Sequence, residues 1–365
     1  MALDLPGPAT DTHALVAADA STPVLTRSLP RWVNPVNVIG LCLVGLLAVW
    51  LVVNFVKSPS QFFEASLIGI TNGCVYALVA LGYTLVYGIL ELINFAHGDV
   101  FMLGGMFAIS FATWFGLAPG PWYEWMPLAV LILILCAICC AVINATIEVV
   151  AYRPLRHAPR LAPLITAIGV SFILETIAQI WKGSDYVSFP EVLPTTNMFT
   201  IGGVGVPWTT PIVVLLTVPV LIGLTFLVRS TKQGKAMRAT AQDRDAAAIM
   251  GINVNRTISF TFLLAGSLAG AGGLVFGMSG ANLNFQSGFT LGLIAFTSAV
   301  LGGIGNLTGA VLGALLIGLI QAYNEALTWH APGSDWTESL VFTILILILV
   351  FRPEGLLGER TPEGA

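Results

Sequence analysis

Long apolar runs, separated by short polar segments, occupy most of the chain from residue 38 onward. A helix needs about 20 mainly apolar residues to cross the hydrocarbon core of a bilayer. The runs are 38–55, 62–90, 100–116, 127–150, 162–181, 211–228, 258–278, 289–303, 308–327 and 340–351. The run 289–303 is short and bounded by glycine, so it either spans the membrane or re-enters on one side. The pattern predicts an all-α, polytopic transmembrane helical bundle with roughly eight to ten spans, ten being preferred.

Basic residues gather in three places, and these places predict the orientation of the chain. The groups are Arg153, Arg156 and Arg160; Arg229, Lys232, Lys235, Arg238, Arg244 and Arg256; and Arg352 and Arg360. Lys and Arg are enriched in loops on the cytoplasmic side of a membrane. With ten spans, all three groups and the N-terminus face the cytoplasm, while the opposite loops hold only Lys57 and Lys182.

The polar parts of the chain define its expected organisation. Residues 1–34 form a disordered cytoplasmic N-terminal tail, because they are polar and contain many Pro and Ala residues. Residues 35–352 form the transmembrane domain, which contains a long cytoplasmic loop at 229–256. Residues 353–365 form a cytoplasmic C-terminal tail.

Composition supports the membrane interpretation. Apolar residues make up 56% of the chain, charged residues 9%, and the mean hydropathy is +0.88. A soluble domain carries about 25% charged residues. The chain has too few charges to cover a water-facing surface, and its net charge of −4 says little about partners.

The sequence lacks the motifs of common enzyme and metal sites. The segment Gly234-Lys235-Ala236 does not continue as a phosphate-binding loop, so ATP is not bound in that manner. Cys136, Cys139 and Cys140 fall on one helical face, but no His, Asp or Glu nearby completes a metal site, and we interpret them as packing residues. We expect no catalytic residues, no metal and no cofactor, with an intramembrane hydrolase as the weakest alternative.

Glycine pairs four residues apart predict close packing of helices. The pairs are Gly266 and Gly270, Gly273 and Gly277, Gly305 and Gly309, and Gly309 and Gly313. Such small-residue pairs let the backbones of membrane helices approach each other. Packing within the subunit is the preferred interpretation, with a contact to a second subunit or a hinge as the alternatives.

The loop at 231–256 is too long for a simple turn between two spans. Residues 241–250 have the composition of a short amphipathic helix, with small and apolar residues beside Asp243, Arg244 and Asp245, and Gly251 ends it. Such a helix either docks into the groove of a partner protein or lies flat on lipid. The local sequence does not distinguish the two.

Polar residues also interrupt the apolar pattern at 93–99, where Asn94, His97 and Asp99 lie near the predicted cytoplasmic face. One interpretation is a solvated turn in which Asp99 caps the next helix. The other is an inner gate or a coupling element.

The acids Glu64, Glu148 and Glu175 lie near the ends of predicted spans, where snorkelling or capping accounts for them. None lies clearly at the middle of the bilayer, where a proton relay needs an acid. A proton- or sodium-coupled secondary carrier is therefore the weaker alternative among transporters.

Several segments, in order along the chain, resemble LivH-type branched-chain amino-acid permeases of binding-protein-dependent ABC importers. The coupling loop of such permeases, Glu-Ala-Ala-x-x-x-Gly, is similar to DAAAIMG at 245–251, with Asp in place of Glu. The other segments are NGCVYALVALGYTLVYGIL at 72–90, INFAHGD at 93–99, RPLR at 153–156 and FRPEGL at 351–356. The resemblance extends over residues 62–358.

The resemblance implies a multi-pass permease subunit of a bacterial inner membrane. The implied partners are a second related permease, two ABC ATPase subunits that hydrolyse ATP, and a periplasmic solute-binding protein; no nucleic acid is expected. Asp245, Ala246, Ala247 and Gly251 are then the residues that dock the ATPases, whose movement drives alternating access.

The solute follows from the resemblance alone. Branched-chain amino acids are the expected solutes, and urea or short-chain amides, which related permeases also carry, are the alternative. The sequence does not identify the residues that line the path.

Overall fold

The structure of the chain, a computed structural model, describes residues 35–358 apart from 121, 157, 160, 194, 195, 202 and 353. The expected N-terminal tail and most of the expected C-terminal tail lie outside the described residues. The chain divides into two units, residues 1–48 and 49–365. The first unit contains the start of helix α1 (Pro35–Lys57), and the features below belong to the second.

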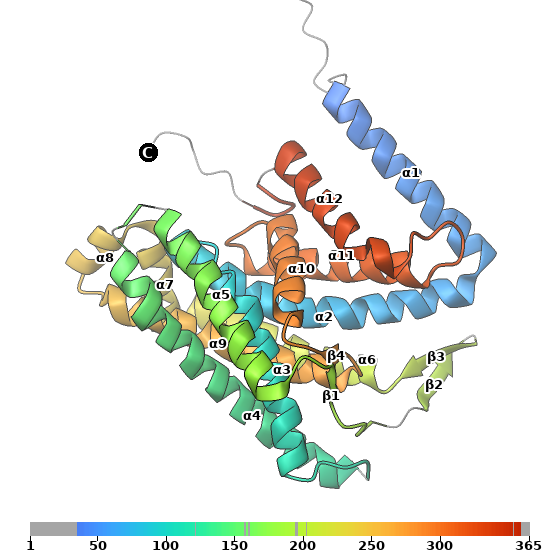
Figure 1. Ribbon diagram of the computed structural model, residues 1–365. Helices are drawn as coiled ribbons and strands as arrows, with labels where there is room; N and C mark the ends of the chain where they lie inside the picture. Colours follow the sequence, from blue (N-terminus) through green and yellow to red (C-terminus); the bar gives the residue numbers. More distant parts are fainter. Residues whose placement is uncertain are drawn as a thin grey trace, which may run out of the picture. The chain divides into compact units, whose positions relative to one another are not determined.

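The chain is mostly helical, and a helix forms at each of the ten apolar runs. The helices after α1 are α2 (Pro59–Leu90), α3 (Ala96–Trp114), α4 (Trp122–Ile147), α5 (Leu161–Lys182), α6 (Thr209–Ser230), α7 (Lys232–Gln242), α8 (Arg244–Ile249), α9 (Val254–Met278), α10 (Ser287–Gly302), α11 (Leu307–Ala326) and α12 (Thr337–Phe351). Helices α7 and α8 belong to the polar loop between α6 and α9 (Figure 1).

Seven helical stretches of the described residues are long and apolar enough to cross a membrane. They are Pro59–Leu90, Tyr123–Leu155, Leu161–Lys182, Thr209–Ser230, Val254–Met278, Leu307–Ala326 and Ser334–Phe351. The described part of α1 and helix α10 are apolar but shorter, and α3 carries His97 and Asp99 in its first turn. The expected number of eight to ten spans is therefore not confirmed.

Two short antiparallel strand pairings lie in the connections between helices. The strands are β1 (Val187–Ser188), β2 (Asn197–Ile201), β3 (Val204–Pro207) and β4 (Asn282–Leu283). Strand β1 pairs antiparallel with β4, with Val187 opposite Leu283, and β2 pairs antiparallel with β3. The first pairing joins the segment after α5 to the segment after α9.

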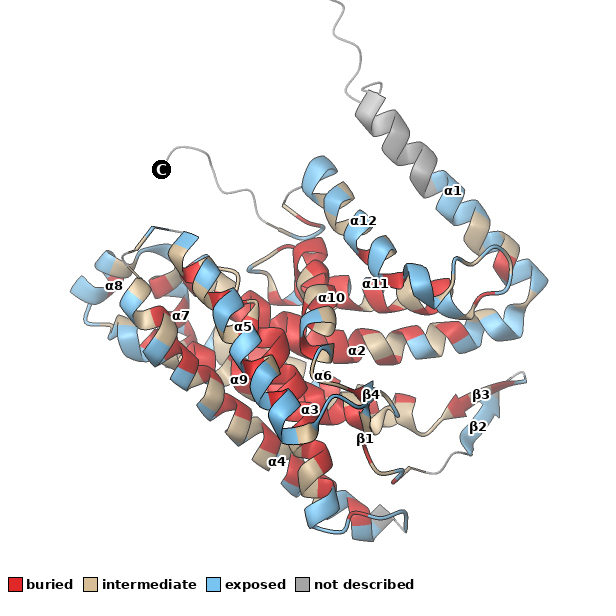
Figure 2. Ribbon diagram, viewed as in Figure 1, coloured by how far each residue is buried: buried red, intermediate tan, exposed pale blue. Residues whose placement is uncertain are grey.

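Helices α2, α3 and α9 form the interior of the bundle, and α5, α6 and α12 lie outside it (Figure 2). In the most apolar part of α2, 89% of the residues are buried, whereas in Ser334–Phe351 only 11% are. The apolar side chains exposed on the outer helices are suited to contact lipid, because the bilayer interior is as apolar as a protein core.

Glycine allows α2 and α11 to lie side by side with their backbones in contact (Figure 1). A Cβ atom added at Gly73 would lie 2.7 Å from the Cα atom of Leu315, and one added at Gly318 would lie 2.4 Å from the amide nitrogen of Gly73. No side chain fits at these distances. The packing of the two helices therefore requires glycine at positions 73 and 318.

The pair Gly266 and Gly270 of α9 confirms the prediction of helix packing within the subunit, whereas Gly277 of the second pair faces Phe189, which is outside any helix. Gly266 and Gly270 face α4, where a Cβ atom on Gly270 would lie 2.4 Å from the carbonyl oxygen of Cys136. Cys136 and Cys140 are completely buried there, which confirms their interpretation as packing residues, whereas Cys139 is only partly buried.

One glycine pair is wrongly interpreted from the sequence. Gly309 and Gly313 face the backbone of α10, but Gly305 lies in the turn before α11 at a φ of +93° with no neighbour to pack against. The spacing of Gly305 and Gly309 is therefore no sign of a helix interface.

We predict that Gly318→Ala destabilises the protein by about 1–3 kcal/mol, because the added methyl group overpacks the contact of α2 with α11. Gly223→Ala is the matched control, since no atom lies within 4 Å of a Cβ added at this exposed position of α6. Thermal unfolding of the detergent-solubilised protein measures both changes. Equal unfolding temperatures for the two variants would contradict the packing described here.

Candidate functional site

The polar loop between α6 and α9 forms two helices with a corner at Asp243. The Asp243 carboxylate accepts hydrogen bonds from the backbone N–H groups of Asp245 and Ala246, at 2.9 and 3.0 Å. Asp243 thus ends α7 and caps the start of α8. The prediction of one helix over residues 241–250 is therefore wrong, because a side-chain cap begins a new helix within it.

Gly251 ends α8, as the sequence predicts. Its φ is +82°, a left-handed conformation that glycine adopts without strain. The N–H of Gly251 bonds to the carbonyl of Ala248, and the N–H of Ile252 bonds to the carbonyl of Ala247, both at 3.0 Å. These two bonds form a Schellman motif, which fixes the direction of the chain after α8.

Helix α8 buries one small side chain against the bundle, and two large apolar side chains at its end are exposed. Ala247 is buried, whereas Ile249 and Met250 are 86% and 81% exposed. Asp245 and Ala246 are exposed as well. Two adjacent, almost fully exposed apolar side chains are suited to contact another surface.

Arg244 joins α8 to the end of α2. Its Nη2 atom donates hydrogen bonds to the carbonyl oxygens of Ile89 and Leu90, at 3.1 and 3.2 Å. These carbonyls belong to the last turn of α2, where the helix dipole favours a positive charge. The sequence indicates a basic residue at the start of α8 but gives no sign of this partner, which lies 154 to 155 residues away.

A buried carboxylate joins the end of α4 to the start of α9. The side chain of Glu148 is fully buried in a π-helical turn (Glu148–Tyr152), and it forms ion pairs with Arg153, at 3.2 Å, and with Arg156. Ser259 of α9 donates a hydrogen bond to the same carboxylate at 2.6 Å. The interpretation of Glu148 as a snorkelling or capping acid is therefore wrong.

The residues Asn94, His97 and Asp99 are all buried, with exposed fractions of 3%, 0% and 0%. The solvated-turn interpretation is therefore wrong. Phe95 occupies the position before α3, and Asp99 lies in the first turn without capping it. The polar side chains of this segment contact other residues inside the bundle, not water.

Each of these three side chains meets a different part of the bundle. The Tyr152 hydroxyl donates to Asn94 Oδ1 at 2.7 Å. His97 lies edge-on to the ring of Tyr83, with 4.9 Å between the ring centroids. Asp99 accepts a hydrogen bond from Ser171 of α5. The structure thus ties the start of α3 to three other elements, and it does not gather the three residues into one site.

A cavity of about 460 Å³ lies between the polar loop and the neighbouring helix ends. We call it the loop cavity. It is lined by Ile89, Leu90, Glu91, Leu92, Leu155, Arg156, Ala158, Pro163, Thr240, Ala241, Gln242, Asp243, Arg244 and Asp245. It combines both signs of charge with an apolar wall.

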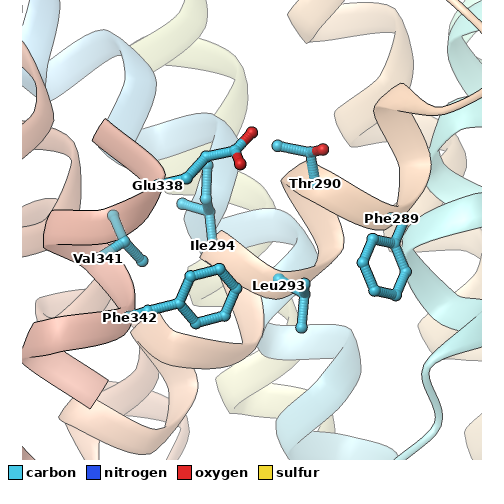
Figure 3. A pocket seen from close by; sticks show the side chains of 7 residues that line it. All are labelled: Phe289, Thr290, Leu293, Ile294, Glu338, Val341 and Phe342. Atoms are coloured by element: carbon cyan, nitrogen blue, oxygen red, sulfur yellow. The ribbon is translucent and has the colours of Figure 1, made fainter. Parts of the chain in front are cut away.

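A second cavity, between α10 and α12, is smaller and has a different character (Figure 3). Its volume is about 120 Å³, and the figure shows Phe289, Leu293 and Phe342 beside it. Glu338 is the one charged side chain in its lining. It therefore offers a small apolar space and no paired charges.

We predict that Glu148→Gln lowers the stability of the protein by about 3 kcal/mol, because it leaves two arginines around a buried neutral side chain. Glu124→Gln is the control, since Glu124 is exposed at the other end of α4. The measurement is thermal unfolding in detergent. Unfolding of both variants at the wild-type temperature would show that the ion pairs contribute nothing.

Comparison with known proteins gives the family of the chain. A family model described as "branched-chain amino acid transport system / permease component" matches residues 66–350. The high-affinity branched-chain amino acid transport system permease protein BraD of Pseudomonas aeruginosa is 38% identical over 301 residues, which cover 81% of this chain and 95% of BraD. The corresponding protein LivH of Escherichia coli K12 is 34% identical over 310 residues, which cover 83% of this chain and 97% of LivH.

A more distant relative extends the comparison to an archaeon. The probable branched-chain amino acid transport permease protein LivH of Methanocaldococcus jannaschii is 30% identical over 298 residues, covering 77% of this chain and 88% of that protein. No solved structure matches the chain. The resemblance identified from the sequence motifs is confirmed, and the chain belongs to the family of permease components of branched-chain amino acid transport systems.

Proposed function

We propose that the chain is the permease subunit of an ATP-driven importer of branched-chain amino acids. The observation that carries this proposal is the 38% identity to BraD over 301 residues. The family match extends from the first turns of α2 to the last turn of α12, so it involves the whole helical bundle rather than one motif. The missing phosphate-binding loop agrees with ATP hydrolysis on other subunits.

The proposed assembly has four kinds of partner around this chain: the lipid bilayer, a second related permease, two ABC ATPase subunits and a periplasmic solute-binding protein. The location is a bacterial inner membrane, with the N-terminus in the cytoplasm. The concentration of Arg and Lys in the 153–160 and 229–256 segments supports this orientation. Ten spans, counting α1, α3 and α10, are compatible with it.

Helix α8 is the proposed docking element for an ATPase subunit. The exposed side chains of Ile249 and Met250 provide the contact, and Asp245, Ala246 and Ala247 lie on the same helix. The bend at Gly251 sets the angle at which α8 projects. Exposed apolar residues on a short capped helix support docking into a groove rather than simple solvation.

The proposed route of coupling runs from α8 to α2. Arg244 bonds to the last carbonyls of α2, so a displacement of α8 pulls directly on that helix. Helix α2 in turn packs against α11 through Gly73 and Gly318, without flexible side chains between the two backbones. Movement of the docked ATPases then shifts the two helices together, as alternating access requires.

Asn94, His97 and Asp99 are proposed to form part of an inner gate or of the coupling path. The segment follows directly on Glu91, which ends α2 in a left-handed conformation at a φ of 55°. Its bonds to Tyr152 and Ser171 connect the end of α2 with α5 and the turn after α4. A rearrangement at the end of α2 therefore bears on these contacts.

The function is tested by uptake of labelled leucine into cells with and without the gene. We predict that deletion removes most of the uptake, that the wild-type gene restores it, and that isoleucine competes whereas alanine and urea do not. If deletion left leucine uptake unchanged and removed urea uptake, the chain would still be an importer subunit, but branched-chain amino acids would not be its solutes.

The docking role is tested by Gly251→Trp. We predict that it lowers leucine uptake by more than tenfold with an unchanged amount of protein in the membrane, because a bulky residue at positive φ is strained by about 1–3 kcal/mol and redirects α8. Gly203→Trp is the matched control, since Gly203 has a φ of +87° in the turn between β2 and β3. Normal uptake by the Gly251 variant would reject docking through α8.

A further inference from the structure

The loop cavity has the size of a binding site for a small molecule. Its volume is about 460 Å³, within the range of roughly 300–1,000 Å³ that is usual for ligand pockets. Three parts of the chain line it: the end of α2, the residues Leu155, Arg156, Ala158 and Pro163, and the corner between α7 and α8. The proposed docking contacts, Ile249 and Met250, lie outside this lining, whereas the proposed coupling residue Arg244 lies in it.

Two arginines provide unused hydrogen-bond donors in the lining. The side chain of Arg156 is only 9% exposed; its Nη atoms donate to Asn255 and Glu148, and its buried Nε atom has no hydrogen-bond partner among the described residues. Arg244 uses Nη2 for the carbonyls of Ile89 and Leu90. A buried N–H group without a partner is uncommon, and it indicates a place for an acceptor.

Three carboxylates lie in the lining with the arginines. Glu91, Asp243 and Asp245 are exposed, whereas Arg156 and Arg244 are both partly buried. The negative groups therefore lie at the rim, and the positive groups lie deeper. A polyanion such as a nucleotide is repelled by the rim, and a simple amine gains nothing from the arginines.

The remaining wall of the cavity is aliphatic. It is formed by Ile89, Leu90, Leu92, Leu155 and Pro163. A ligand that fills the cavity consequently needs a carboxylate, a cationic group and an apolar side chain. These are the parts of an aliphatic α-amino acid.

We propose that the loop cavity binds a free aliphatic amino acid from the cytoplasm, and that this occupancy restrains import. The carboxylate of the amino acid accepts hydrogen bonds from Arg156 and Arg244, and its ammonium group pairs with the rim carboxylates. The inference rests on the proposed function in one respect, since the ligand is then the transported product.

Through Arg244, the bound amino acid affects the link between α8 and α2. A carboxylate is a stronger acceptor for a guanidinium group than a neutral carbonyl oxygen. The bound ligand therefore competes with Ile89 and Leu90 for Arg244 and weakens the link between α8 and α2. Import slows as the product accumulates, because docking at α8 no longer moves α2.

Binding is measured by calorimetry on the complete importer in nanodiscs, without the solute-binding protein, which would itself bind leucine. We expect saturable binding of leucine and at least tenfold weaker binding of 4-methylpentanoate, which lacks the ammonium group, and of 3-methylbutylamine, which lacks the carboxylate. Equal binding of all three probes, or no binding of leucine, would overturn the proposal.

Two matched variants locate the site. Ala158→Trp places a large side chain in the cavity lining, and we expect it to weaken leucine binding at least tenfold. Leu161→Trp introduces the same ring three residues later, at a position that is 68% exposed and outside the lining, and we expect unchanged binding. Leucine binding that persists in the Ala158 variant would assign the ligand to another place and reject the loop cavity.

The restraint on import is measured in proteoliposomes, with the solute-binding protein outside and ATP inside. The quantity compared is the ATPase rate with internal leucine divided by the rate without it in the same preparation, so a change in the basal rate does not enter. We expect this ratio to be about one third or lower for the wild type and the Leu161 variant. For the Ala158 variant we expect a ratio near one.

The outcomes separate this inference from the proposed function. Leucine import at a rate that internal leucine does not change would reject the inference alone. A complex that hydrolyses ATP in response to its binding protein but imports no leucine would reject the proposed solute.

Discussion

The backbones of α2 and α11 touch through glycine, and this contact constrains the rest of the bundle. Within a bilayer the hydrophobic effect gives helices no reason to associate with each other rather than with lipid. Association depends instead on close van der Waals contact, which Gly73 and Gly318 permit because a Cβ atom at either position would overlap the partner helix. This contact positions α2 against α11, and the last carbonyls of α2 accept hydrogen bonds from Arg244.

Buried charge provides the second constraint, at the end of the bundle that carries α8. Removing Glu148 from water is costly, and the carboxylate is stable there because Arg153, Arg156 and Ser259 satisfy it. The same contacts connect the turn after α4 to the start of α9. Arg156 thus has a structural role in this ion pair and also lies in the lining of the loop cavity.

The errors of sequence interpretation have a common physical origin. Polar residues at 93–99 suggest contact with water, yet Asn94 and Asp99 find their partners in Tyr152 and Ser171, 58 and 72 residues further along the chain. Glu148 lies near the end of a predicted span, and one of the groups that satisfy it is the Ser259 hydroxyl, 111 residues away. Periodicity and local spacing carry no information about such partners. The corner at Asp243, in contrast, is a local cap that the sequence could have indicated.

The sequence by itself determined where the helices form, because a chain in a bilayer must satisfy its backbone hydrogen bonds within each apolar run. It also determined the family, through motifs that recur in order from residue 72 to 356, and the break at Gly251, because only glycine readily adopts that conformation. The tertiary structure alone decided which helices lie inside, which glycines touch, and that Arg244 holds the end of α2. These are contacts between distant segments, and their energies depend on a packing geometry that no local pattern of residues contains.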